Sequence, residues 1–160
     1  MSPRKPKVKR PIALTVQTAK PRPKRVNNLG IHHDDHPTWR LALLDLEHNQ
    51  WGWKKISQAH LRTVLEFLQE MEKDTWKDIW NHQTGGSQRR GAKHKFIAID
   101  KLEKQAQEGL KMLELDDASD TWFRFRLGGK SRLWGVVTDN VFYPVWWDPE
   151  HEVCKSSDQN

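Results

Sequence analysis

The chain has 160 residues, of which 36% are hydrophobic and 30% are charged, with a formal net charge of +6 and nine tryptophans. This length suits one domain rather than two. The single cysteine, Cys154, excludes an intramolecular disulfide and a cysteine-based metal site. No apolar run approaches the ~20 residues that span a bilayer, and "IALTV" is shorter than the ~7–15-residue apolar core of a signal peptide. These features predict a cytoplasmic protein without a membrane partner.

Residues 1–37 are expected to form a disordered basic tail. Positions 1–27 hold nine Lys or Arg and no acidic residue, which leaves 18 of the 27 basic residues, against 21 acidic ones, for the rest of the chain. The same stretch holds five of the eight prolines and few large apolar side chains, so it cannot bury enough surface to offset its ordering entropy. It is either a solubilising leader or an electrostatic arm for RNA, DNA or the ribosome.

The stretch "HHDDH", His32–His36, places metal-ligating side chains close together. In an extended chain His32, Asp34 and His36 would project to one side, as a set of divalent-metal ligands would. Nothing in the local sequence fixes that geometry, and Pro37 follows at once. We therefore assign no metal site and expect no cofactor.

The folded body, expected over residues 38–155, begins with a strand and two helical regions. The apolar run "WRLALLDL" predicts a well-buried strand. Ser57 is a good N-cap, and the helix after it carries an apolar stripe made of Leu61, Val64, Leu65, Leu68 and Met71. The stripe resumes after a break near Asp74 with Trp76, Ile79 and Trp80. Asp100 with Glu103 resembles a capping box for a helix whose stripe is Leu102, Ala106, Leu110 and Leu113.

Three strands are predicted next, over residues 121–127, 131–138 and 141–147. The segments "GGK" and "DN" supply the tight turns between them. Pro144 lacks a ladder donor and predicts an edge or a bulge in the last strand. The expected fold is therefore α+β, with an antiparallel sheet in the order β-α-α-β-β-β and helices packed on one face. Residues 156–160 are expected to be a flexible C-terminus.

Strand alternation sorts the stretch "FRFRLGGKSRLWG". Phe123, Phe125 and Leu127 point one way, and Trp122, Arg124 and Arg126 point the other. The phenylalanines are expected under the helices, and the arginines on an open face. Arg132, just past the "GGK" turn, can reach the same region. Arginine binds phosphate through a planar, bidentate fork, although the same residues could instead pair with surface carboxylates on an ordinary solvated face.

The string "WWDPEH" adds titratable groups at the end of the last strand. Asp148-Pro149 predicts a turn, after which Asp148, Glu150 and His151 lie together. A carboxylate and an imidazole near several arginines can perform acid–base chemistry on a phosphodiester. The alternative for His151 is a turn histidine without a catalytic role. Further candidate RNA contacts are Lys130, Trp122, Trp134, Arg89, Arg90, Lys93 and Lys95.

The element order and the pattern "FRFRL…SRLWGVV…NVFYPVWWD…H" resemble the RelE/HigB/YoeB-type toxins of the ParE/RelE superfamily. That resemblance implies a small α+β endoribonuclease of bacterial or phage origin that cuts messenger RNA, often on the ribosome, and is held inactive by an antitoxin. It implies a metal-free cleavage in which the ribose 2′-hydroxyl attacks the adjacent phosphate. By position, Arg124, Arg126 and Arg132 match the family's basic strands, and His151 matches the acid or base after the last strand.

Two other functions fit the same residues. The chain departs from many family members at Cys154, near the place of a C-terminal tyrosine, and its one tyrosine, Tyr143, lies inside the last predicted strand. A non-catalytic nucleic-acid or ribosome-binding protein would use the tail, residues 89–95 and exposed tryptophans as stacking platforms. A protein-binding module would instead use the tryptophans as interface anchors.

Overall fold

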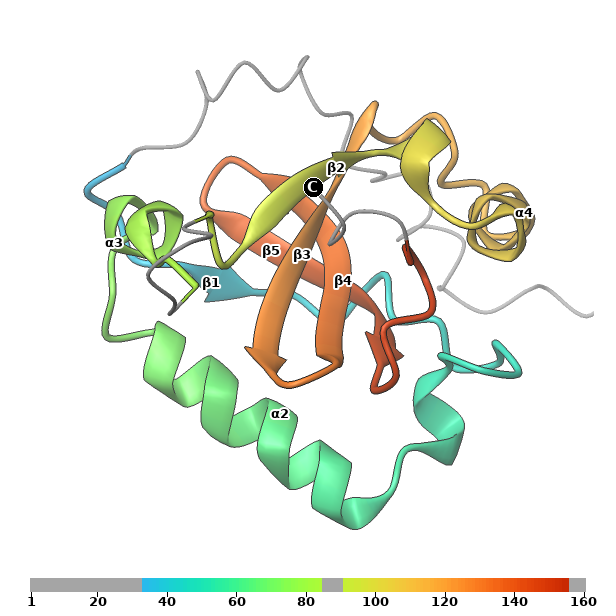
Figure 1. Cartoon of the computed structure of the whole chain (residues 1–160), viewed down its shortest axis with the longest axis horizontal. Coiled ribbons are helices and arrows are strands. Elements are labelled where there is room, and N and C mark those ends of the chain that lie inside the picture. Colours follow the sequence, from blue (N-terminus) through green and yellow to red (C-terminus); the bar gives the residue numbers. More distant parts are fainter. Residues whose placement is uncertain (1–32, 85–90, 156–160) are drawn as a thin grey trace, which may run out of the picture.

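The computed structural model describes residues 33–84 and 91–155, in which five strands form one sheet in the order β1-β5-β4-β3-β2 (Figure 1). The other residues, which include most of the basic tail, Arg89, Arg90 and the last five positions, lie outside the described part. The strands are β1 (Thr38–Trp39), β2 (Lys95–Ala98), β3 (Thr121–Gly128), β4 (Ser131–Thr138) and β5 (Val141–Asp148). The α-helices are α2 (Gln58–Met71), α3 (Trp76–Asn81) and α4 (Lys104–Met112), and the 3-10 turns are η1 (Trp53–Lys55) and η2 (Ile99–Lys101). The predicted α+β class is confirmed, although the sheet is mixed because β1 runs parallel to β5.

The β3–β4–β5 meander follows its local sequence closely. Its three strands begin where the alternation predicts and end within one residue of it. Gly129 and Asp139 occupy the two connecting turns with φ of 50° and 54°, the left-handed region that glycine and aspartate tolerate best. The β4–β5 register shifts between Trp134 and Gly135, next to Pro144, which confirms the predicted bulge.

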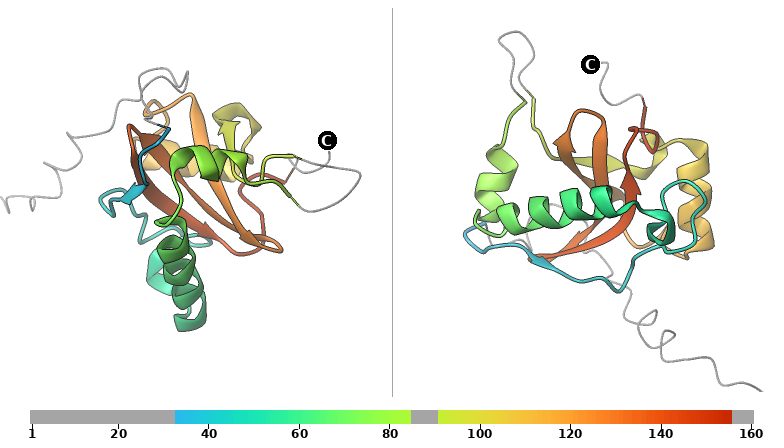
Figure 2. Two further views of the ribbon diagram at one scale, coloured as in Figure 1. Left: turned by 90° about the vertical axis from the view of Figure 1, so that its left-hand side faces the viewer. Right: turned by 90° about the horizontal axis from the view of Figure 1, so that it is seen from below.

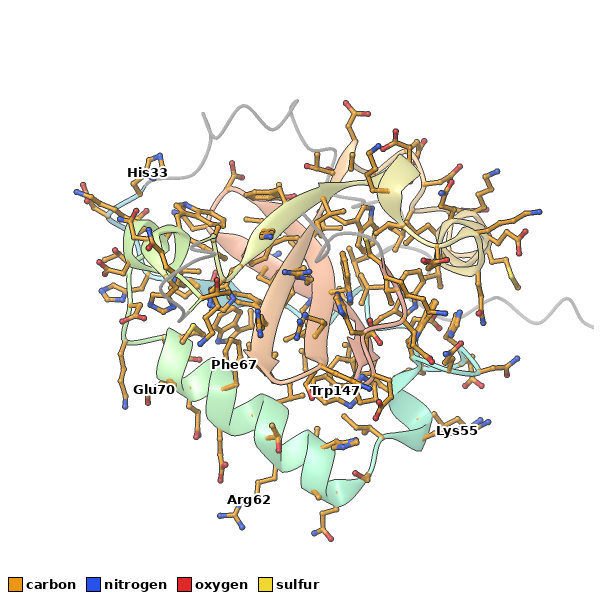
Figure 3. The ribbon with its side chains drawn as sticks, in the orientation of Figure 1. His33, Lys55, Arg62, Phe67, Glu70 and Trp147 are labelled. Carbon is orange, nitrogen blue, oxygen red and sulfur yellow. The ribbon has the colours of Figure 1, made fainter. Side chains whose placement is uncertain are left out.

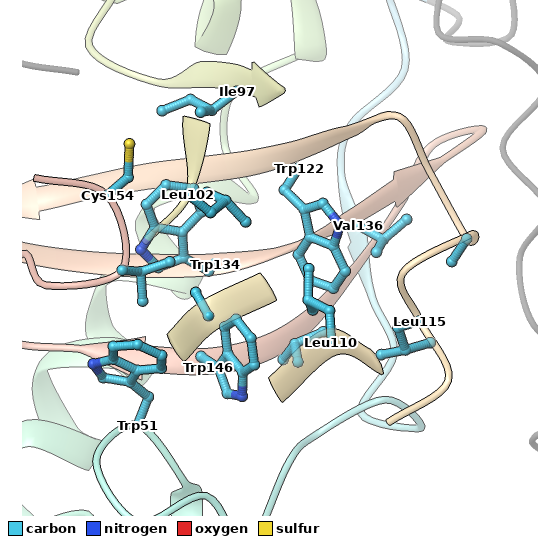
Figure 4. Close-up of a cluster of buried hydrophobic side chains, with 14 residues drawn as sticks. Trp51, Ile97, Leu102, Leu110, Leu115, Trp122, Trp134, Val136, Trp146 and Cys154 are labelled. Carbon is cyan, nitrogen blue, oxygen red and sulfur yellow. The ribbon is translucent and has the colours of Figure 1, made fainter. Parts of the chain in front are cut away.

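The helices cover both faces of the sheet, so the expected packing on one face is wrong. On one face α2 and α3 contribute Val64, Leu68 and Trp76 to a core with Phe123 and Phe125. On the other face α4 packs on a second core, whose members include Ala106, Leu110, Trp122, Trp134 and Trp146 (Figure 4). We call these the α2 face and the α4 face. Helices α2 and α4 lie apart in each view of Figure 2.

The α2 helix touches the sheet along a narrow line. Val64, Leu68 and Met71 are buried, whereas Leu65, which was expected in the core, is 52% exposed. Phe67 points toward the sheet while Arg62 and Glu70 point to solvent (Figure 3). The apolar stripe is therefore wider than the surface that the sheet offers it.

The helix starts are fixed by side chains, with one exception. Ser57 caps α2 by accepting from the His60 backbone N–H, and Thr75 with Asp78 forms a capping box that starts α3 after the predicted break. The capping box expected from Asp100 is wrong, because Asp100 lies in η2 and α4 starts after Glu103 without a side-chain cap. Glu103 is held instead by its backbone N–H, which donates to the Val153 carbonyl at 2.8 Å.

The strand expected from "WRLALLDL" is only two residues long. After β1 the chain leaves the sheet, and single bonds from the following loop cover the outer edge of β5. The Asp45 backbone N–H and the Trp53 indole N–H both donate to the Val145 carbonyl, and the Trp147 backbone N–H donates to the Trp51 carbonyl. Strand β2, by contrast, was missed, because "KFIA" is too short to show an alternation. None of the helices within residues 33–84 and 91–155 is both long enough and apolar enough to cross a membrane.

Candidate functional site

Cations from three strands share one end of the α4 face. Directly opposed residues of antiparallel strands lie on the same face, and Lys95 is opposite Arg124 while Arg126 is opposite Arg132. Like charges that face each other across strands are unfavourable. Asp148 lies opposite Arg132 on its other side and supplies a carboxylate to the second row. The alternation argument therefore placed Arg124 and Arg126 correctly on the face opposite the phenylalanines.

The predicted openness of this face is wrong. Arg124 is 1% exposed and Arg132 is 2% exposed, and His151 from the segment after β5 contacts Arg124. One guanidinium nitrogen of Arg132, Nη1, donates to the Gly129 carbonyl at 2.8 Å and to the Ser131 carbonyl at 3.0 Å. Arg132 therefore holds the β3–β4 turn from inside. Arg126 is partly exposed, and its side chain is nearer to solvent.

Asp148 organises the turn that follows β5. Its Oδ1 accepts from the Glu152 backbone N–H at 2.8 Å, and its Oδ2 accepts from the Val153 backbone N–H at 3.0 Å and from the Trp134 indole at 3.3 Å. Burial raises the pKa of the Asp148 carboxyl, and the three hydrogen bonds oppose that rise without cancelling it. The turn predicted at Asp148-Pro149 is present, and its carboxylate faces inward to the fold.

This turn brings His151 beside Arg124. His151 has a φ of 59°, in the left-handed region, and its Nε2 lies 3.4 Å from Arg124 Nη1. A guanidinium can only donate, so Nε2 accepts and the neutral imidazole carries its proton on Nδ1. His151 is partly exposed, unlike Arg124. The expected meeting of the histidine with the strand arginines thus occurs at Arg124.

The remaining predicted contacts divide by exposure. Lys130 and Glu150 are exposed and form an ion pair at 3.8 Å. Lys93 and Lys95 are partly buried. Trp122 and Trp134, expected as outward stacking platforms, are fully buried in the core under α4, so that expectation is wrong. Indole rings that fill a core cannot stack on bases.

Sequence reasoning missed His94, which is 2% exposed. Its Nδ1 accepts from the Arg126 backbone N–H at 3.1 Å, just beyond the last paired residue of β2. Its place inside the basic run "KHK" suggested a solvated loop. The sequence nonetheless held an indication of burial, because the apolar segment "FIA" directly follows the run "KHK".

Two residues of "HHDDH" make hydrogen bonds to other parts of the fold. Asp35 accepts from the Asn140 side chain, and His36 Nδ1 lies 3.0 Å from the Glu72 carbonyl. Within the described ranges, no three His, Cys, Asp or Glu side chains converge in a way that could hold a metal ion. His32 lies outside those ranges.

Comparisons with protein-family models, with curated proteins and with solved structures found no match to this chain. The site is therefore defined by its geometry. A partly exposed imidazole contacts a buried guanidinium, a second arginine and two lysines lie nearby, and a buried carboxylate fixes the loop that carries the imidazole. Such a set can bind an anion and move a proton at its edge.

Proposed function

We propose that this protein binds RNA at the exposed end of the α4 face and cleaves it without a metal ion, with His151 as the base. The observation that carries the proposal is the 3.4 Å contact between His151 Nε2 and Arg124 Nη1. That distance is long for a hydrogen bond, and catalytic contacts often tighten only with substrate bound. The 2′-hydroxyl of the substrate can therefore replace Arg124 as the partner of Nε2.

The cleavage step follows from that exchange. The 2′-oxygen attacks the adjacent phosphorus, its proton passes to His151 Nε2, and the bond from phosphorus to the 5′-oxygen breaks. The products are a 2′,3′-cyclic phosphate and a 5′-hydroxyl, whose proton comes from water. Arg126 and Lys130 reach solvent and can stabilise the charge that builds on the phosphate oxygens. Arg124, almost fully buried, orients the imidazole before the substrate binds and is a positioning residue.

Replacing His151 tests this role directly. His151→Ala should lower single-turnover cleavage of an RNA ~10²–10⁴-fold, the weight of a general base, and leave binding of an uncleavable 2′-deoxy analogue nearly unchanged. Cleavage is measured with and without ribosomes, because the resemblance to the RelE-type toxins implies a ribosome-bound substrate. His60→Ala is the matched control, since His60 is an exposed histidine on α2. Equal cleavage by wild type and His151→Ala would refute the role of His151.

A second candidate function is RNA or ribosome binding without cleavage. The burial of Arg124 and Arg132, and the use of Arg132 inside a turn, favour it, because two of the arginines then serve the fold. This function predicts equal affinity for RNA and its 2′-deoxy analogue and no product in either setting. Arg126→Ala and Lys130→Ala would still weaken binding.

The resemblance to the RelE-type toxins also implies a protein partner. An antitoxin that covers His151 and Lys130 would silence the site. In cells, the proposal predicts that expression of the protein arrests growth. The arrest should be relieved by His151→Ala and by co-expression of the antitoxin. Growth arrest that persists in His151→Ala would favour the binding function.

A further inference from the structure

A chain of hydrogen bonds runs from the α2–α3 turn to the backbone of β3. His82 Nε2 lies 3.0 Å from Asp74 Oδ2, and His82 Nδ1 lies 3.3 Å from His94 Nε2. His94 Nδ1 in turn accepts from the Arg126 backbone N–H at 3.1 Å. The last β2–β3 pair is Lys95 with Arg124, so the register would place Lys93 opposite Arg126. The His94 imidazole therefore takes the place that a backbone carbonyl would hold in the ladder.

The Arg126 backbone N–H, at the last contact of this hydrogen-bond series, determines which ring nitrogen of each histidine carries the proton. A backbone N–H can only donate, so His94 Nδ1 must be an acceptor. Burial, and then the positive charges of His82, Lys93 and Arg124, lower the pKa of His94 to about 3, and its ring is neutral at neutral pH. Its one proton is therefore on Nε2 and points to His82 Nδ1, and the proton of a neutral His82 points from Nε2 to the Asp74 carboxylate.

An additional proton does not fit this arrangement. His82 could take it only on Nδ1, where it would face the proton on His94 Nε2. His94 cannot move its own proton to Nδ1, because that atom faces the Arg126 N–H. One contact must open, and the weakest by length is the 3.3 Å contact between the two rings. His94 would then lose the neighbour that orients it toward Arg126.

Within the described residues, two of the neighbours of the His94 ring are apolar. Phe67 from α2 and Phe125 from β3 pack against its ring, with centroids 6.0 and 5.1 Å away. Among the described residues, the charged groups that act on the two imidazoles are Asp74 from the α2–α3 turn, Asp78 from α3, Lys93 from the segment before β2, and Arg124 from β3. Of the two rings, His82 is the accessible one, with about a third of its side chain exposed, 30%.

We propose that Asp74, His82 and His94 form a proton-linked switch, which holds the Arg126 end of β3 while His82 is neutral and loosens it when His82 takes up a proton. Arg126 is the partly exposed arginine of the candidate RNA site. An effect of the switch on RNA rests on the proposed function, whereas the switch itself does not. The two are separated by a readout at the Arg126 amide, which needs no RNA.

The test is an NMR titration of the full chain from pH 8 to 4.5, with circular dichroism to verify that the fold persists. The ring signals of His82 and His94 and the Arg126 amide should shift with one common midpoint. The hydrogen-exchange protection factor of that amide should fall about tenfold, the weight of one hydrogen bond. His60, an exposed histidine outside this series of contacts, is the internal control. The shift of the Arg126 amide should not follow that of the His60 ring.

His82→Gln is the matched variant. Its amide can accept from His94 and donate to Asp74, but it cannot take up a proton in this range. The Arg126 transition should disappear in this variant while its protection at pH 8 stays within about twofold of wild type. An Arg126 amide that stays unchanged through the His82 titration, a His82 that does not titrate, or a transition that survives in His82→Gln would each overturn the switch.

Discussion

Arg132 is an arginine whose surroundings assign it a structural task. It is 2% exposed, and its Nη1 bridges two carbonyls of the β3–β4 turn. Arg132→Ala should lower the free energy of unfolding by about 2–3 kcal/mol, because it removes a buried, charged donor that holds two carbonyls of the turn. Arg132→Lys should recover part of that loss, since lysine supplies charge without the fork.

Urea denaturation measures the free energy of unfolding of both variants. The control is Lys130→Ala, because Lys130 lies in the same turn but is exposed, and this variant should stay within about 0.5 kcal/mol of wild type. If Arg132→Ala keeps full stability and loses only RNA binding, the guanidinium serves a ligand and not the turn.

Asp148 gives the fold a dependence on pH that runs against that of most carboxylates. Its pKa is raised in the folded state by burial, so between the ordinary carboxyl range near pH 4 and the raised value the folded state binds more protons than the unfolded state. The stabilisation from this group is therefore full at low pH and is lost as the pH rises through the raised pKa.

The measurement is the free energy of unfolding at several pH values above 4, compared between wild type and Asp148→Asn. In the variant, the free energy of unfolding should lack the part of its pH dependence that comes from Asp148. It should also be less stable overall, because an amide NH₂ would face one of the three donors that the carboxylate accepts. A wild-type slope retained in full by Asp148→Asn would assign it to other groups.

At the scale of elements, the close approach of α4 to the sheet depends on Gly109. A Cβ added there would lie 2.9 Å from Trp146 Cζ2 and 3.3 Å from Cη2. Gly109→Ala gains about 1 kcal/mol in helix propensity but overpacks a buried contact at a cost of ~1–3 kcal/mol. We expect a net loss of about 1 kcal/mol in the free energy of unfolding, with a change in the fluorescence of the neighbouring indoles.

Gly128→Ala is the matched control, because a Cβ at Gly128 meets no atom within 4 Å. A Gly109→Ala variant more stable than wild type would mean that α4 can move away from Trp146 without penalty.

The elements also divide by how far the sequence predicts them. The β3–β4–β5 meander was predictable because its alternation and its turns are local signals. The side of the sheet that α4 covers was not, because an apolar stripe such as Ala106 and Leu110 says which side of a helix is buried and not what buries it. The same holds for the site. Alternation and the turn after Asp148 predict that His151 approaches the arginines, but the burial of Arg124 depends on tertiary contacts such as that with His151, which form only in the folded chain.

At the scale of the whole molecule, positive charge is divided between the tail and the candidate site. Positions 1–27 carry nine basic residues and no acidic one, whereas the rest of the chain has more acidic than basic residues. Deleting residues 1–27 should change the free energy of unfolding by less than about 0.5 kcal/mol while it weakens RNA binding and flattens its dependence on salt.

Equilibrium binding at several salt concentrations, beside a denaturation curve, tests both parts. A large loss of stability would show that the tail packs as structure, and an unchanged salt slope would show that RNA does not contact it.

The loop that covers β5 also decides how this sheet can meet other molecules. Bonds from Asp45, Trp51 and Trp53 occupy backbone groups along that edge, so another chain cannot easily add a strand there. The outermost strand on the opposite side is β2, which has four residues and begins at Lys95. Short length and an edge lysine are the usual protections against uncontrolled strand addition. Aggregation that starts from the folded state would therefore begin at β2, and replacing Lys95 with an apolar residue is the change that would promote it.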